Sequence, residues 1–203
     1  MKIICIGRNY VDHIAELQNE RPDEPVIFLK PDTALLQKQF PFVIPEFSTD
    51  VHHEIEIVVK INKVGKYIDA KFAHKYYDEV TVGIDFTARD IQDQLKAKGL
   101  PWEKAKGFDG SAVIGDFMPK TDFESLDAVN FELISNGVVA QKGNTQNMLW
   151  KVDELIAEVS KYFTLKTGDL IFTGTPKGVA KVSPGDVLEG FLEDKKLFKI
   201  QVK

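Results

Sequence analysis

Short apolar runs, separated by polar turns, are the most frequent pattern along this chain. They predict strands at residues 26–29, 53–61, 80–84, 170–172 and 187–188, because the runs are compact and bounded by glycine, proline or charged residues. The apolar residues near the start of the chain, Ile3 to Ile6, predict a further buried strand. Strands therefore account for much of the expected core.

Four segments instead favour helices, because they carry apolar residues at helical spacing or residues typical of helix ends. They lie at residues 11–20, 71–77, 87–98 and 148–162, and the last has the clearest apolar stripe. Thr87 is expected to cap the third helix, and Gly99 followed by Pro101 to end it. Many strands with few helices, no linker and no repeat predict a single α+β domain over residues 1–203.

Composition and charge narrow the class of protein. Hydrophobic residues make up 43% of the chain and charged residues 28%, values typical of a globular protein. The net charge of −5 argues against a nucleic-acid partner, and no segment is apolar enough for a membrane partner to be expected. Cys5 is the only cysteine, which excludes an intrachain disulfide and favours the reducing cytoplasm.

Three carboxylates are candidate metal ligands. Glu54 and Glu56 lie two apart on a predicted strand and so share a face, while Asp85 ends the strand at residues 80–84. Their spacing alone favours the plainer interpretation, a solvated face of an edge strand, because this pattern is common. If they do bind a metal, an all-oxygen site predicts Mg²⁺ or Mn²⁺, or Ca²⁺, over Zn²⁺.

Other polar residues are also candidates for chemistry. His13 and Glu16 lie three apart on the first helix, where a carboxylate orients an imidazole that acts as a general base; the alternative is a solvated surface pair. Lys106 is either a partner for a substrate carboxylate or an exposed lysine. The turn from Thr173 to Gly178 follows a strand, and either binds an anion through backbone N–H groups or is simply tight.

Taken together and in order, six motifs resemble the fumarylacetoacetate hydrolase family, specifically its small, single-domain, acylpyruvase-like branch. These are Gly7-Arg8-Asn9-Tyr10 with Asp12-His13, Phe28-Leu29-Lys30-Pro31, His52-His53-Glu54-Ile55-Glu56, Asp85-Phe86-Thr87-Ala88-Arg89-Asp90, Lys98-Gly99-Leu100-Pro101-Trp102 and Thr173-Gly174-Thr175-Pro176-Lys177-Gly178-Val179. Each motif alone is weak, but six in the same order, spread over nearly the whole chain, are specific. They reverse the preference for a surface role of the three carboxylates.

The resemblance implies a mixed β-sheet roll that binds a divalent metal through Glu54, Glu56 and Asp85. It also implies that residues 1–20, approximately, form part of a lid over the active site, and that the protein is a homodimer. The catalytic residues it implies are His13 and Glu16, which activate water, and Lys106. The substrate contacts it implies are Arg8, Lys30, Gln92 and Thr175.

The function implied by the resemblance is that of a metal-dependent hydrolase or lyase of small 2-oxo acids. Such an enzyme cleaves the C–C bond of acylpyruvates, decarboxylates oxaloacetate, or does both, through a pyruvate enolate held by the metal. One alternative is an isomerase or tautomerase of 2-hydroxy-dienoate or oxaloacetate-type substrates. Another is a metal-binding module without catalytic activity, which has no need of His13, Glu16 and Lys106 together.

Overall fold

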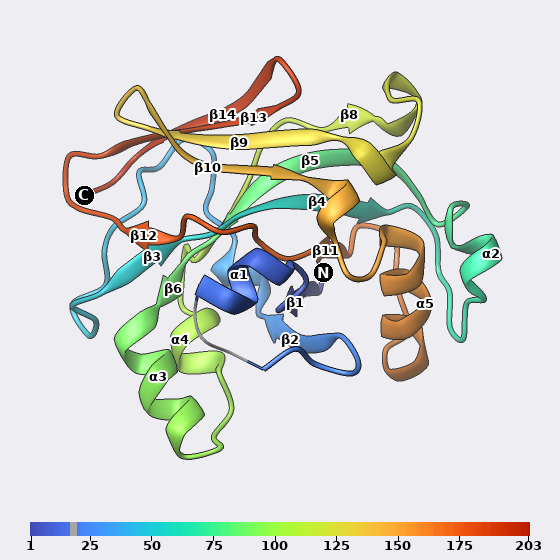
Figure 1. Ribbon diagram of the computed structural model, residues 1–203, viewed down its shortest axis with the longest axis horizontal. Helices are drawn as coiled ribbons and strands as arrows, with labels where there is room; N and C mark the ends of the chain where they lie inside the picture. The colour runs from blue at the N-terminus through green and yellow to red at the C-terminus, as the bar shows by residue number, and fades with distance from the viewer. Residues whose placement is uncertain (17–19) are drawn as a thin grey trace.

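A mixed seven-stranded sheet forms the centre of the protein (Figure 1). The computed structural model describes residues 1–16 and 20–203. In this sheet β1 runs parallel to β11, and all other neighbouring strands are antiparallel. The spatial order is β2 (Val26–Lys30), β1 (Ile3–Gly7), β11 (Leu170–Phe172), β4 (Ile55–Ile61), β5 (Tyr77–Asp85) and β7 (Ala112–Ile114), with β8 (Met118–Pro119) also paired to β5.

Two smaller sheets complete the β structure. A four-stranded antiparallel sheet packs across β4 and β5, and a three-stranded sheet continues beyond the end of β4 (Figure 1). The first contains β10 (Val138–Asn144), β9 (Asn130–Ser135), β13 (Val187–Leu192) and β14 (Lys195–Gln201), and the second contains β12 (Ala180–Lys181), β3 (Val51–His53) and β6 (Thr87–Ala88). These curled, mixed sheets with few helices confirm the predicted α+β roll.

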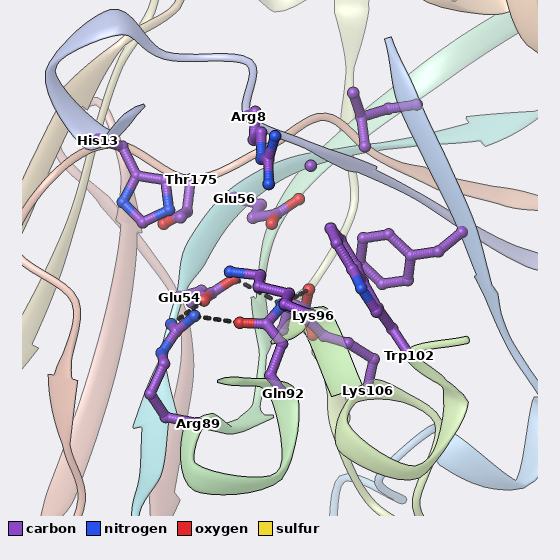
Figure 2. A pocket seen from close by; sticks show the side chains of 14 residues that line it. Arg8, His13, Glu54, Glu56, Arg89, Gln92, Lys96, Trp102, Lys106 and Thr175 are labelled. Atoms are coloured by element: carbon purple, nitrogen blue, oxygen red, sulfur yellow. Dashed lines mark hydrogen bonds and ion pairs between the residues drawn. The ribbon is translucent and has the colours of Figure 1, made fainter. Parts of the chain in front are cut away.

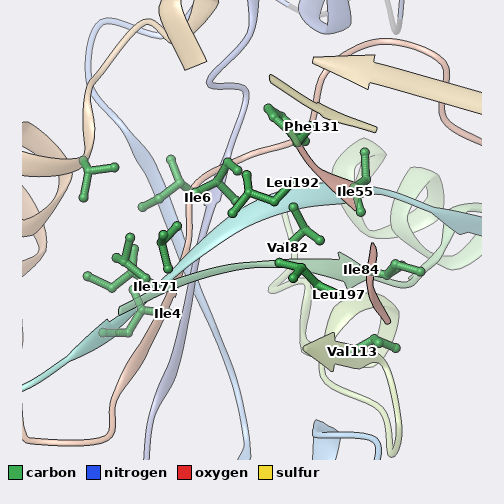
Figure 3. Close-up of a cluster of buried hydrophobic side chains, with 14 of the residues drawn as sticks. Ile4, Ile6, Ile55, Val82, Ile84, Val113, Phe131, Ile171, Leu192 and Leu197 are labelled. Carbon is green, nitrogen blue, oxygen red and sulfur yellow. The ribbon is translucent and has the colours of Figure 1, made fainter. Parts of the chain in front are cut away.

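The main core lies between the seven-stranded and four-stranded sheets. Ile55, Val82 and Ile84 of the larger sheet meet Phe131 and Leu192 of the smaller one, all buried in one cluster (Figure 3). The opposite face of β4 is covered as well, since its alternate residue Val58 packs in a second cluster. Each fully buried side chain of this size contributes about 1.5–3 kcal/mol. This double burial explains why β4 is a nearly continuous apolar run.

Five helices of the described residues surround the sheets. They are α1 (Val11–Glu16), α2 (Ala70–Ala73), α3 (Arg89–Ala97), α4 (Glu103–Lys106) and α5 (Val152–Tyr162). Single 3₁₀ turns occupy Asp32–Ala34, Lys120–Asp122, Leu126–Ala128 and Thr145–Asn147. No helix in the described residues is both long and apolar enough to cross a bilayer.

Helix bounds in the structure differ from those predicted. The helix predicted at residues 71–77 is only the single turn α2, and Tyr77 already belongs to β5, where it pairs with Ile61 and is buried. The helix predicted from Met148 begins at Val152, because Met148 instead forms a β-bridge with Tyr10. The first helix is described as far as Glu16, and the rest of its predicted length includes residues 17–19, which lie outside the described residues.

The predicted cap of the third helix was wrong. Thr87 lies in β6, and α3 begins after Ala88 without any capping side chain. The hydroxyl of Thr87 instead accepts a hydrogen bond of 2.6 Å from Lys106. A residue that resembles a helix cap in the sequence therefore belongs to the polar cluster described below.

Candidate active site

Three carboxylates converge where the central strands end. Asp85 is the last residue of β5, as predicted, and Glu56 lies in β4 opposite Gly83. Glu54, which was predicted to lie within one continuous strand, occupies the break between β3 and β4. The backbone N–H of Asp85 donates to the carbonyl of Glu54 at 2.9 Å, which holds the break against the end of β5. The chain thus changes from one sheet to another at a candidate ligand.

The carboxylates form a compact buried cluster. One oxygen from each of Glu54, Glu56 and Asp85 lies within 4.8 Å of the other two, and the three residues are 4%, 2% and 1% exposed. Buried like charges so close together repel one another unless cations compensate them. The plainer interpretation, a solvated strand face, is therefore wrong.

Two buried lysines and an arginine supply compensating charge. Lys106 Nζ donates to Glu54 Oε2 at 2.7 Å and to Asp85 Oδ2 at 2.6 Å. Arg89 donates to Glu54 Oε1, and Lys30 Nζ lies 2.8 Å from Asp85 Oδ1. Glu56 accepts a hydrogen bond of 2.7 Å from the backbone N–H of Gly174, and no cation of the described residues forms an ion pair with it.

These contacts give Glu54 and Glu56 different electrostatic environments. Burial favours the neutral form of Glu54, but the charges of Lys106 and Arg89 outweigh it and hold its pKa well below the usual value. For Glu56, burial and then the nearby charges of Asp85 and Glu54 raise the pKa well above the usual value. Burial likewise opposes the charge of Lys106, yet Asp85 and Glu54 raise its pKa. Glu56 is therefore the carboxylate with the greatest need of another cation.

The donor set fits a hard divalent cation. All three candidate ligands offer carboxylate oxygens, which Mg²⁺, Mn²⁺ and Ca²⁺ prefer. Asp85 Oδ1 is buried and receives no hydrogen bond from the described residues, despite its proximity to Lys30. A bound cation would give Asp85 Oδ1 a partner and would compensate the negative charge of Glu56.

His13 and Glu16 are joined as the sequence suggested. His13 Nδ1 lies 3.1 Å from Glu16 Oε2, and Glu16 Oε1 accepts a hydrogen bond of 2.9 Å from the N–H of Gly178. Because the carboxylate accepts, Nδ1 carries the proton and Nε2 has a free lone pair. His13 is buried, and burial lowers its pKa, which keeps the imidazole neutral. It lines the same pocket as the three carboxylates.

The structure brings most of the predicted substrate contacts to this pocket. Arg8, Gln92 and Thr175 all line it, with Arg8 and His13 on one side and Arg89, Gln92 and Lys106 on the other (Figure 2). Lys30 does not line it. Its ammonium is buried behind Asp85 and donates to Ser111 Oγ at 2.9 Å and to the carbonyl of Lys106. In this position Lys30 orients Asp85 and the end of α4.

Polar or aromatic residues that line the pocket, and that sequence reasoning did not single out as site residues, include Arg89, Lys96 and Trp102. Arg89 and Trp102 belong to quoted motifs, which was the available signal, whereas nothing in the sequence marked Lys96. The free volume of the pocket is about 30 Å³, room for one or two water molecules.

The protein is a mixed β roll whose pocket combines three buried carboxylates with a histidine from α1. Comparison with known proteins identifies the family. Residues 2–200 match the family model for the C-terminal domain of fumarylacetoacetate hydrolase. The chain belongs to this family, as the motifs predicted.

Named relatives are similar over most of their length. A mitochondrial oxaloacetate decarboxylase of Dictyostelium discoideum is 46% identical, over 93% of this chain and 87% of the relative. An oxaloacetate tautomerase of Escherichia coli is 42% identical, over 92% of this chain and 86% of the relative. The crystal structure of a fumarylpyruvate hydrolase of Pseudomonas aeruginosa, in complex with Mn²⁺ and pyruvate, superposes with a TM-score of 0.94 at 32% identity, covering 100% of this chain and 89% of that one. These relatives are enzymes.

Proposed function

We propose that this protein is a divalent-metal-dependent enzyme of small 2-oxo acids and that oxaloacetate is its substrate. The observation that carries the proposal is that the buried Glu54, Glu56 and Asp85 share one pocket with the His13–Glu16 pair. The first group fits a cation, and the second is a base with its orienting carboxylate. The names of the decarboxylase and tautomerase relatives support oxaloacetate.

Glu54, Glu56 and Asp85 would hold the cation. A bound Mg²⁺ or Mn²⁺ would polarise the 2-oxo group and stabilise negative charge that develops on its oxygen. The related fumarylpyruvate hydrolase is in complex with Mn²⁺, which supports this assignment. Lys106 already uses three hydrogen bonds, to Glu54, Asp85 and Thr87, and an ammonium has three donors. A substrate oxygen that binds Lys106 must replace one of those bonds.

His13 would carry the proton. In tautomerisation its free Nε2 takes a proton from C3 of the keto acid, the electron pair of that bond forms the C2–C3 double bond, and the 2-oxo oxygen gains a proton as the enol forms. In the reverse direction the oxygen loses its proton and the imidazolium returns one to C3. In decarboxylation the bond between C3 and C4 breaks, its electron pair stays with C3 and CO₂ leaves. A proton from solvent then reaches C3 through His13. Glu16 holds the ring in one tautomer in both cases.

Acylpyruvate hydrolysis is the second candidate. It uses the same dyad, except that His13 takes its proton from a water molecule that attacks the distal carbonyl. The likeness to a fumarylpyruvate hydrolase favours it. Isomerisation of 2-hydroxy-dienoates would need the same proton transfer without attack by water.

The experiment is an absorbance assay of EDTA-treated protein with oxaloacetate and with acetylpyruvate, before and after Mg²⁺ or Mn²⁺ is added, with products identified by NMR. Each metal without protein controls for spontaneous decarboxylation. We expect metal-dependent turnover of oxaloacetate, and the products separate tautomerisation from loss of CO₂. Turnover that EDTA leaves unchanged would contradict the metal site, and no turnover of either acid would contradict the proposal.

A cytoplasmic homodimer is part of the proposal. Cys5 is buried and unpaired within the described residues, which suits a reducing compartment. Light scattering of the purified protein would measure the mass of the assembly, and a monomeric mass would contradict the dimer.

A further inference from the structure

Lys96 is a cation in the pocket without an anionic partner. It lies near the end of α3, is half-buried and lines the same pocket as the three carboxylates. Its side chain reaches across the pocket, between Arg8 and Gln92 in the view of Figure 2. No carboxylate of the described residues lies within 4 Å of its ammonium. By contrast, Arg89 and Lys106, which line the same pocket, form ion pairs with Glu54 and Asp85.

Aromatic residues near Lys96 support its side chain. Its ammonium lies 5.6 Å from the ring centre of Trp102, within the range of a cation–π contact. Trp102 returns to α3 because Gly99, at φ +61°, ends the helix and Pro101 follows. The indole packs on Phe28, with ring centres 5.7 Å apart, and against the backbone of Gly7. Lys96 therefore lies on a fixed aromatic surface.

Two cations of the pocket lack an ion pair within the described residues. Arg8 lines it as well, forms no ion pair within the described residues and has a buried Nε without a hydrogen bond. Lys106, Arg89 and Lys30 form ion pairs with Glu54 or Asp85. Little of their charge therefore remains for a second acidic group of a substrate. The free positive charge lies with Lys96 and Arg8.

We propose that Lys96 is a specificity-determining residue that binds the second carboxylate of a dicarboxylic 2-oxo acid. This inference rests on the proposed function and extends it to a substrate class: the pocket selects dianionic acids over acids with a single carboxylate. A half-buried ammonium forms a charge-assisted hydrogen bond to such a group, and Arg8 contributes to the field without being the residue tested. The burial that lowers the pKa of Lys96 also weakens its hydration, which strengthens its attraction for a carboxylate.

The test compares two ligands that differ by one carboxylate, malate and lactate, in the presence of Mg²⁺. Their dissociation constants are measured by calorimetry on the wild type, Lys96→Met and Lys96→Arg. Lys98→Met is the matched control, because Lys98 is exposed and lies two residues further along the same segment. Circular dichroism and a melting curve check that each variant folds.

We expect the wild type and Lys98→Met to prefer malate over lactate by about tenfold to a hundredfold. Lys96→Met should lose most of that preference, and Lys96→Arg should retain it. An undiminished preference in Lys96→Met, or a wild type that binds both ligands equally or binds neither, would overturn the inference. Turnover of oxaloacetate with an unchanged preference in Lys96→Met would leave the proposed function standing and remove only Lys96. A preference for malate that depends on Lys96, without turnover of oxaloacetate, would support the role of Lys96 and contradict the proposed function.

Discussion

Gln141 and Thr175 join two parts of the candidate site through one buried amide. Gln141 Nε2 donates to Thr175 Oγ1 at 2.9 Å, and Gln141 Oε1 accepts from the backbone N–H of Ile55 at 3.0 Å. Ile55 lies between the two glutamates, and Thr175 lines the pocket. Gln141 is 1% exposed and does not line the pocket itself. Its role is therefore to position the loop after β11 relative to the strand that carries the candidate metal ligands.

Replacing Gln141 with Leu should impair both stability and substrate binding. The substitution leaves the N–H of Ile55 buried without its partner and removes the hydrogen bond that Thr175 Oγ1 accepts, which costs about 1–3 kcal/mol of the free energy of unfolding. Denaturant titration measures that loss, and kinetics well below the melting temperature should show a raised KM for oxaloacetate. Gln94→Leu, at an exposed position of α3, is the control. An unaltered KM in a destabilised variant would show that Gln141 supports the fold alone.

Removing the imidazole of His13 should separate catalysis from metal binding. General acid–base groups typically contribute about 10²- to 10⁴-fold to kcat, so His13→Ala should lose activity on that scale while Mg²⁺ affinity is retained. Glu16→Gln should lose less, because the amide oxygen still accepts from Nδ1 of His13. His74→Ala tests an exposed histidine as the control. Full activity of His13→Ala would exclude the imidazole from the reaction.

Glu56 provides the sharpest test of the metal site. Because Glu56 is the proposed ligand that forms no ion pair with a cation of the described residues, Glu56→Gln should weaken Mg²⁺ and Mn²⁺ binding by about tenfold or more. Calorimetry on the metal-free protein measures this directly, with Glu124→Gln, an exposed glutamate, as the control. The variant should also need a higher metal concentration to recover activity after EDTA. Equal affinities for the wild type and Glu56→Gln would remove this ligand from the site.

The sequence indicated those parts of the fold and site that depend on local pattern. The apolar runs placed β2, β5 and β11, and the end of a run placed Asp85 where a rigid strand presents it. Helix bounds were less predictable, because tertiary contacts decided them: the β-bridge of Met148 to Tyr10 prevents the last helix from starting earlier. The interruption of the strand at Glu54 likewise follows from its passage between two sheets, for which the local sequence carries no signal.

The partners of charged residues were the least predictable part. Lys30 and Lys106 are 76 residues apart, yet the ammonium of Lys30 donates to the carbonyl of Lys106 and lies against Asp85. Such contacts are set by the packing of α4 against β2 and not by spacing. The motifs named Lys30 as a substrate contact, and only the structure placed it behind the ligand cluster. Lys96 was missed because a lysine near the end of an amphipathic helix is ordinarily solvated.

The pH dependence of ligand preference should identify Lys96 independently of its removal. Burial, and then the charges of Arg89 and Arg8, lower the pKa of Lys96 to about 8, against the opposing charges of Asp93 and Glu54. Below this pKa the ammonium is charged and the preference for malate over lactate is present. As the pH rises through about 8 the charge is lost, and the preference should fall, although malate itself stays a dianion. An arginine keeps its charge over this range, so Lys96→Arg should hold the preference to about pH 9.5. Calorimetry in a series of buffers follows both proteins, and an equal decline in the two would assign the titration to a different group.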